Sequence, residues 1–260
     1  MTERVDAVPA SRRHEGMGGL AKGLAILELF GANRAQVTVS EAAVLTGTTP
    51  AAARRCLLTL MARGYLSHDG KYFKPTPRVL RLTAAYSATA TLPGLAIPFL
   101  VSARDCLAES VSLAVLDGSD ALFVARAESD RIVSAGVRVG ATLPAHASAT
   151  GRVLLASLSD EELDTHLRTC RPLPTTTHTL TTVASIRDRV RQVQVDGVAY
   201  TDEELELGLR TMAVPVQDSQ GRTHAAMSVS SLAVRVTLED MARNFLPVLQ
   251  LEASRLGNML

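Results

Sequence analysis

Two serines lie two positions apart in the run AAMSVSSL, at Ser228 and Ser230. The run has the composition of a β-strand, and residues two apart on a strand point to the same face of a sheet. Two hydroxyls on one face can bind a small polar ligand, although serines on strands are more often solvated or bonded to backbone. Arg126, in another strand-like run, can bind a carboxylate, or it can simply pair with Glu128 or a neighbour on the sheet.

A second set of candidate residues lies between Val37 and Lys74. Ser40 is the expected N-cap of a first short helix, and a tight turn around Gly47 follows it. Thr49 caps a second helix, which ends at Gly64, and a short hairpin with Asp-Gly at its turn comes next. Helix, turn, helix and two-stranded ribbon describe a winged helix-turn-helix, which places its second helix in the major groove of double-stranded DNA.

Side chains near the start of that second helix would contact bases or phosphates. An arginine there can hold guanine bidentately or hold a phosphate, and the alternative for each is a solvated surface position. The expected DNA-contacting residues are Thr48, Thr49, Ala51, Ala52, Arg54, Arg55, Lys71 and Lys74. On a two-fold dimer, two such helices would read half-sites about 34 Å apart, which predicts an inverted or direct repeat in the operator.

Charge is unevenly distributed along the chain, whose net charge is only +1. Residues 1–90 carry 12 Lys/Arg against 6 Asp/Glu, whereas residues 91–260 carry 15 against 20. A basic smaller part and an acidic larger part indicate one polyanionic partner and one different task. With no apolar run of 18 residues, no secretory signal and three widely spaced cysteines, we expect a cytoplasmic protein without a membrane span or disulfides.

Breaks in the pattern predict the domain organisation. We expect a flexible arm at 1–18, a winged helix-turn-helix domain at 19–76, a linker helix at 77–92 and a larger domain at 93–260, where Pro93-Gly94 marks the last boundary. The larger domain mixes helices with strands joined by hairpin turns, which favours an α+β fold with a largely antiparallel sheet.

Three further patterns concern single elements. Leu20, Leu24, Leu27 and Phe30 share one face of the first helix and are expected in its core. The segment GATLPAH at 140–146 is expected to be a loop. One long helix is expected from Val236 to the C-terminus.

Several stretches, taken together, resemble the IclR family of bacterial transcriptional regulators over residues 18–256. They are GLAKGLAILELF with RCLLTLMARGYL, VGATLPAHASATGRVLLASLSDEEL, and DGVAYTDEELELGLRTMAVPV with AAMSVSSL. The segment DRIVSAGVRVGATLPAH is most similar to the branch that controls aromatic catabolism through protocatechuate and the β-ketoadipate route. The resemblance implies a GAF-like effector domain, a small organic acid as effector, and a homodimer or homotetramer.

The resemblance also implies an effector site between the sheet and the loop before a helix rich in small residues. Backbone N–H groups at the N-terminus of that helix, at Ala149, Thr150 and Gly151, would favour a carboxylate. Ser228 and Ser230 match the family's paired serines, and the acidic contact of some members falls on Thr201 or on Asp202. The expected effector-contacting residues are Ile132, Ala135, His146, Ala149, Thr150, Gly151, Thr201, Asp202, Thr211, Ser228 and Ser230.

Two other classes of protein could carry a DNA-binding domain of this kind. A hydrolase or transferase with an appended DNA-binding domain is the alternative, but the chain has no Gly-x-Ser-x-Gly elbow, Walker loop or His-Glu-x-x-His motif. His166 and Cys170 are four apart, which is more often incidental than catalytic. An architectural DNA-binding protein would not need the large α/β part. We therefore expect no enzyme activity, no cofactor and no metal.

Overall fold

The computed structural model of the chain describes residues 17–31, 34–82, 91–129 and 137–260. The chain divides into two compact units, Met1–Ala85 and Tyr86–Leu260, and each is described by itself. The predicted arm falls almost entirely outside the described residues, as do half of the predicted linker helix and two expected effector contacts, Ile132 and Ala135. Among the described helices, none has the length and apolar character to span a membrane.

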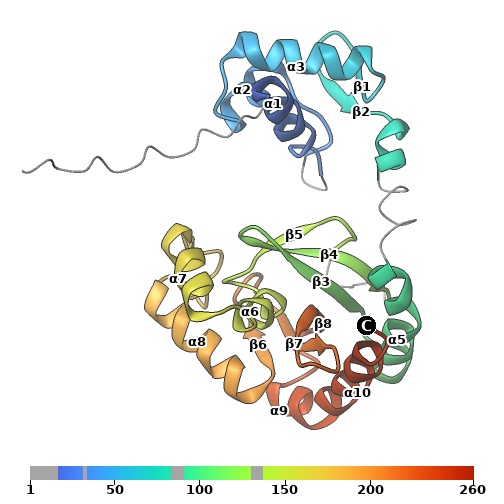
Figure 1. Ribbon diagram of the computed structural model, residues 1–260, viewed down its shortest axis with the longest axis vertical. Coiled ribbons are helices and arrows are strands. Elements are labelled where there is room, and N and C mark those ends of the chain that lie inside the picture. Colours follow the sequence, from blue (N-terminus) through green and yellow to red (C-terminus); the bar gives the residue numbers. More distant parts are fainter. Residues whose placement is uncertain (1–16, 32–33, 83–90, 130–136) are drawn as a thin grey trace, which may run out of the picture. The chain divides into compact units, whose positions relative to one another are not determined.

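The smaller unit consists of short helices followed by a two-stranded antiparallel ribbon (Figure 1). Val37 adds a single bridge to the second strand of the ribbon, at Phe73. This confirms the winged helix-turn-helix predicted from the sequence. The elements are α1 (Gly18–Leu27), α2 (Val39–Leu45), α3 (Pro50–Ala62), β1 (Leu66–His68), β2 (Phe73–Pro75) and the 3-10 turn η1 (Pro77–Val79).

Helix α2 begins earlier than predicted. Its N-cap is Thr38 rather than Ser40, because Thr38 and Glu41 form a reciprocal capping box. The Thr38 hydroxyl accepts from the N–H of Glu41 at 3.2 Å, and the Glu41 carboxylate accepts from the N–H of Thr38 at 2.7 Å. Ser40 has no Glu or Gln three residues later and cannot close such a box.

Helix α3 begins and ends where the sequence predicts. The hydroxyl of Thr49 caps it, with Pro50 in its first turn. At the other end Gly64 adopts a φ of +78°. Its N–H bonds to the carbonyl of Met61, and the next N–H, that of Tyr65, bonds to the carbonyl of Leu60. This pair of bonds satisfies the last carbonyl groups of the helix and turns the chain into the ribbon.

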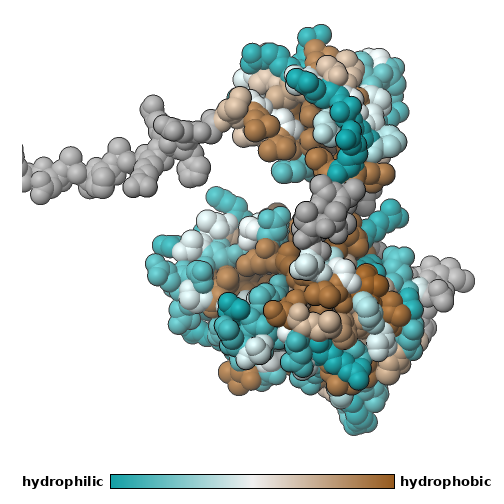
Figure 2. Space-filling model, turned by 45° about the vertical axis from the view of Figure 1, so that its right-hand side comes forward, coloured by the Kyte–Doolittle hydropathy of each residue, from teal (hydrophilic) through white to brown (hydrophobic). Residues whose placement is uncertain are grey.

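The core of the smaller unit differs from the predicted one on α1. Ile26 is fully buried, together with Leu57 of α3, whereas Leu20 and Leu24 are 60% and 49% exposed. The apolar residues of α1 cover more than one face, so packing against α3 rather than helical periodicity decides which face is buried. Exposed apolar side chains of this unit include Met17, Leu20, Leu24, Val44 and Leu45. Figure 2 shows hydrophobic residues among the hydrophilic ones on the face of the unit turned to the viewer.

The larger unit is built on a six-stranded sheet of described strands, in which every neighbouring pair is antiparallel (Figure 1). The spatial order is β5-β4-β3-β8-β7-β6. This confirms the predicted mixed fold with an antiparallel sheet. The strands are β3 (Val111–Asp117), β4 (Asp120–Ala127), β5 (Thr142–Pro144), β6 (Ala199–Asp202), β7 (Leu209–Gln217) and β8 (Thr223–Leu232).

Helices cover both faces of this sheet. On one face, α5 and α10 bury Leu100 and Leu249 against Met227 of β8. On the other face, α6 buries Val153 against small residues of the sheet, and α8 packs on α6. The helices are α5 (Thr91–Leu107), α6 (Ala149–Ala156), α7 (Asp160–Thr169), α8 (Val183–Asp196), α9 (Leu238–Asp240) and α10 (Leu246–Gly257).

Three predictions about single elements were wrong. Pro93 and Gly94 do not interrupt the chain but lie in the first turn of α5, where a proline sacrifices no intrahelical hydrogen bond. The expected loop at 140–146 contains β5, an edge strand of the sheet, which pairs with β4. The C-terminal helix begins at Leu238 and includes a π-helical turn, Met241–Phe245.

Candidate functional site

Helix α3 presents exposed residues near its N-terminus, as a DNA-reading helix requires. Thr49, Ala51, Arg54 and Arg55 are exposed. Ala52 was predicted on the same face, and this was wrong: it is only 8% exposed, because it lies on the inner side of the helix beside a buried alanine. Its N–H instead donates to the capping hydroxyl of Thr49 at 3.3 Å.

The ribbon holds the two predicted lysines differently. The Lys71 ammonium is exposed and lies 4.9 Å from the ring centroid of Tyr72. The Lys74 ammonium is 2.8 Å from the carboxylate of Asp69. Hydrogen bonds from Lys74 and from two backbone N–H groups hold the pKa of Asp69 well below its usual range. A phosphate would therefore have to compete with Asp69 for Lys74. Thr48 is half-buried, with its hydroxyl 2.9 Å from that of Thr46.

The paired serines of β8 face α6 and belong to polar rows that cross the sheet. Ser228 lies opposite Ser112 of β3, which in turn lies opposite Arg126 of β4. Ser230 lies opposite Thr211 of β7, and their hydroxyl oxygens are 3.0 Å apart. The two predicted serines therefore share one face, and the register brings further hydroxyls and a guanidinium onto it.

Arg126 reaches this face because β4 contains a bulge. The register steps from Leu113 opposite Ala125 to Ala114 opposite Phe123, so β4 has one extra residue there. A bulge shifts the alternation of side chains by one position. Phe123 and Arg126, three residues apart, consequently both line the space under α6. Simple alternation would have placed the arginine on the opposite face.

The polar rows end at a small cavity beneath the N-terminus of α6. Its volume is about 30 Å³, which is room for a single water molecule. The first N–H groups of a helix have no partner within the helix, so this wall is suited to an anion. The lining residues are Ser112, Phe123, Arg126, Val137, Leu143, Ser148, Ala149, Thr150, Thr201, Leu205, Leu209, Thr211, Ser228 and Ser230.

The guanidinium at this cavity is almost completely enclosed. The Arg126 side chain is 6% exposed, whereas that of its partner Glu128 is 65% exposed. Arg126 donates from Nε to Glu128 at 3.2 Å and from Nη1 to the hydroxyl of Ser112 at 3.0 Å. Of the two alternatives for Arg126, the pair with Glu128 is present, and the Arg126 side chain also lines the cavity.

A buried ion pair joins the two loops that flank the cavity. Arg152 of α6 is fully buried and donates to both carboxylate oxygens of Glu204, at 2.9 and 2.5 Å. Its Nε donates to the carbonyl of His146 at 2.9 Å. The carbonyl of Glu204 accepts from the hydroxyl of Thr179 at 2.6 Å. The loop before α6 and the loop after β6, which supplies Leu205 to the cavity, are therefore held together.

Three predicted effector contacts do not line the cavity. The N–H of Gly151 donates to the capping hydroxyl of Ser148 at 3.0 Å and is not available to a ligand. His146 is buried, and burial first, then the charge of Arg152, lowers its pKa. Asp202 pairs with Arg210 at 2.6 Å. Of the two alternatives Thr201 and Asp202, it is Thr201 that lies at the cavity.

Several cavity residues were not identified from the sequence. Ser112 follows only from the pairing of β3 with β8, and Leu205 and Leu209 only from the path of the β6–β7 loop. A polar residue in a run that otherwise reads as a buried strand, VSLAVL at Ser112, was the available signal.

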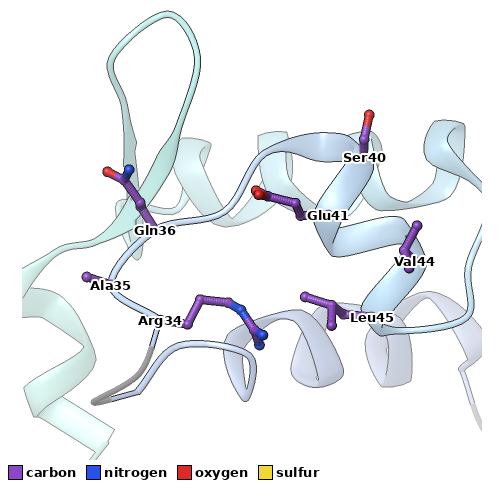
Figure 3. A pocket seen from close by; sticks show the side chains of 7 residues that line it. All are labelled: Arg34, Ala35, Gln36, Ser40, Glu41, Val44 and Leu45. Atoms are coloured by element: carbon purple, nitrogen blue, oxygen red, sulfur yellow. The ribbon is translucent and has the colours of Figure 1, made fainter.

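A second depression, of about 610 Å³, lies on the smaller unit between α2 and the segment 34–36 (Figure 3). Figure 3 shows Arg34 and Glu41 on opposite sides of it. Its polar side chains lie at the surface, and the carboxylate of Glu41 is already used in the capping box. The enclosed cavity of the larger unit is therefore the better candidate for a ligand site.

Comparison with known proteins extends over both units. The IclR helix-turn-helix domain matches residues 19–70, and the C-terminal domain of bacterial transcriptional regulators of the IclR type matches residues 85–257. The Pca operon regulatory protein of Acinetobacter baylyi is 38% identical over 253 residues, which cover 95% of this chain and 91% of that protein.

Solved structures show the same architecture. A transcriptional regulator from Rhodococcus sp. RHA1 matches with a TM-score of 0.77 and 38% identity, over 93% of this chain and 97% of that one. The inducer-binding domain of a double mutant of the PobR transcription factor from Acinetobacter, in complex with 3-hydroxybenzoic acid, matches 66% of this chain and 100% of that one. Its TM-score is 0.62 and its identity 32%. The chain belongs to the IclR family of bacterial transcriptional regulators.

Proposed function

We propose that this protein binds an operator through α3 and that an aromatic carboxylic acid, bound beneath α6, changes its affinity for that operator. The observation that carries the proposal is the enclosed guanidinium of Arg126 in a cavity lined by hydroxyls. An enclosed cation beside a helix N-terminus favours an anion. Regulation of aromatic catabolism is supported by the similarity to the Pca operon regulatory protein.

The cavity offers different partners to the two ends of such an acid. Arg126 and the N–H groups of Ala149 and Thr150 suit a carboxylate, whereas the hydroxyls of Ser230 and Thr211 suit a ring hydroxyl. The PobR domain binds 3-hydroxybenzoic acid, which carries both groups. A substituted benzoate therefore fits the chemistry of this wall better than a short aliphatic acid.

Entry of an aromatic ring requires the site to expand, because the cavity holds about 30 Å³. The side chains that must yield are apolar, namely Leu143, Leu205 and Leu209. Arg152 bonds both to Glu204, in the loop that carries Leu205, and to the carbonyl of His146, just after the strand that carries Leu143. The two segments would therefore move together. A ligand that binds only the expanded state shifts the protein toward that state, which is how occupancy can alter DNA affinity.

At the DNA end we propose that Thr49, Ala51, Arg54, Arg55 and Lys71 contact the operator. Their exposure on α3 and the ribbon supports this. Two copies would bind an inverted or direct repeat with half-sites about 34 Å apart. The exposed apolar residues of the smaller unit support a dimer or tetramer.

The organisation we propose keeps an arm at 1–18, a DNA-binding domain at 19–76, a linker at 77–92 and an effector domain at 93–260. A regulator of this kind works in the cytoplasm, where bacterial DNA lies, and carries out no enzymatic reaction.

Calorimetric titration with 3-hydroxybenzoate, 4-hydroxybenzoate and protocatechuate tests the effector site. We expect at least one of these acids to bind, and Arg126→Gln to weaken it about 10–100-fold, because a charge-assisted hydrogen bond contributes about 1.5–3 kcal/mol. Arg222→Gln is the matched control, because Arg222 also pairs with a carboxylate but on the β7–β8 turn. Equal losses in both variants would contradict the assignment of Arg126.

Gel-shift titration of the same acids with promoter DNA tests the coupling between the two sites. We expect the binding acid to change operator affinity about 5–150-fold in one direction. Unchanged DNA affinity at saturating acid would separate ligand binding from regulation and refute the proposed function.

A further inference from the structure

The strand end that supplies Arg126 also supplies a carboxylate directly beside it. Glu128 lies two residues after Arg126, and its Oε1 is 3.2 Å from the Nε of Arg126. On its other side, the Nη1 of Arg126 donates to Ser112, a cavity residue, at 3.0 Å. One guanidinium thus bonds simultaneously to an acid of its own chain and to the wall of the candidate effector site.

The two carboxylate-binding roles of Arg126 compete with each other. A guanidinium holds a carboxylate best through two parallel N–H···O bonds, and this geometry uses its nitrogens in pairs. While Glu128 occupies Nε, an incoming acid finds one donor engaged and a negative charge close by. An enclosed arginine without an anionic partner would be unfavourable, so Glu128 also stabilises the arginine in the empty site.

The exposure of Glu128 makes this partner easy to displace. Its side chain is 65% exposed, whereas that of Arg126 is 6% exposed. Water can take over the solvation of Glu128 when the pair opens, and a pair with one exposed member is weak. The arginine cannot leave the site as readily, because its side chain is buried and its Nη1 also donates to the hydroxyl of Ser112 on β3.

We propose that Glu128 is an internal competitor that occupies Arg126 until the carboxylate of the effector displaces it. This inference rests on the proposed function. Glu128, which lies outside the cavity, would then help to set the effector concentration at which the protein responds. Removal of the charge of Glu128 should therefore tighten acid binding. A residue that merely oriented Arg126 for the ligand would have the opposite effect.

Calorimetric titration of the full chain with 4-hydroxybenzoate and with its neutral analogue 4-hydroxybenzamide tests the proposal. We expect Glu128→Gln to bind the acid about 1.5- to fivefold more tightly than wild type, the range for a solvent-screened ion pair. Affinity for the amide should stay unchanged, because the amide does not compete for a cation. Glu239→Gln is the control, since it removes the same charge from an exposed pair between Glu239 of α9 and Arg243 of the π-helical turn and should alter neither affinity.

The double variant Arg126→Gln/Glu128→Gln tests whether Glu128 acts through Arg126. In an Arg126→Gln background, Glu128→Gln should no longer tighten acid binding, because the shared guanidinium is gone. Unchanged or weaker acid binding by Glu128→Gln alone would overturn the inference while leaving the proposed function intact. Failure of both wild type and Glu128→Gln to bind 3-hydroxybenzoate, 4-hydroxybenzoate and protocatechuate would overturn both, and a thermal-shift measurement of each variant would show that it is folded.

Discussion

Replacement of Arg152 by methionine isolates the contribution of the buried ion pair between α6 and the β6–β7 loop. The substitution keeps most of the apolar stem but removes three donors, two to Glu204 and one to the carbonyl of His146. The Glu204 side chain, 8% exposed, would then keep its charge without a cation. Removal of one partner of a buried pair typically costs about 3–5 kcal/mol, and we expect Arg152→Met to fall in this range.

Differential scanning calorimetry of the full chain measures this cost. For a unit of this size 1 kcal/mol corresponds to about 2–4 °C, so the transition of the larger unit should fall by roughly 6–20 °C. Arg187→Met is the matched control, because Arg187 pairs with Asp164 across two helices at a partly exposed site. We expect this control to cost at most about 1 kcal/mol.

The double variant Arg152→Met/Glu204→Met separates two causes of lost stability. One is the loss of the ion pair itself, and the other is the burial of an unpaired carboxylate. Replacement of both ionic partners by apolar residues is often nearly neutral, so the double variant should recover most of the stability lost by the single one. If Arg152→Met cost no more than Arg187→Met, the pair would not hold the two loops together. A double variant as unstable as the single one would show that the unpaired carboxylate of Glu204 does not cause the loss of stability.

Three further outcomes follow from the structure. Gly151→Ala should lower the stability of the larger unit by about 1–3 kcal/mol, because the added Cβ would lie 2.2 Å from a backbone atom of the preceding loop. Gly94→Ala has open space around its Cβ and should stabilise α5 by up to about 1 kcal/mol. Equal melting temperatures of the two variants would contradict this packing. Burial holds the pKa of His146 and of His166 below the usual 6.5, so the unfolded chain takes up protons that the folded chain does not, and stability should fall as pH decreases below about 6.5. Melting curves of His146→Asn and His166→Asn between pH 7 and pH 5 should show a smaller fall than wild type. Arg55→Ala should weaken specific DNA binding by about 1–3 kcal/mol in a gel-shift titration, and unchanged discrimination between operator and random DNA would remove a base-reading role.

The pattern of amino acids determined the parts of this protein that depend on neighbours in the chain. Thr49 and Pro50 start α3 and Gly64 ends it, because caps and turns are satisfied within a few residues. Ser159 and Glu162 cap α7 for the same reason. The winged helix-turn-helix follows from such local signals, and the serine pair of β8 follows from the two-residue period of a strand.

Only the tertiary structure decided which polar side chains lie together beneath α6. Ser112 lies beside Ser228 because β3 pairs with β8, two segments that are far apart in the chain. Arg126 reaches the same face through a β-bulge, which the sequence pattern does not predict. Arg152 finds Glu204 across 52 residues of chain. Such contacts depend on register and on loop paths, which are set by packing over the whole unit. The sequence therefore predicted an acid-binding site near the serines and named Arg126 as a possible carboxylate partner, whereas only the tertiary structure places the two at one cavity.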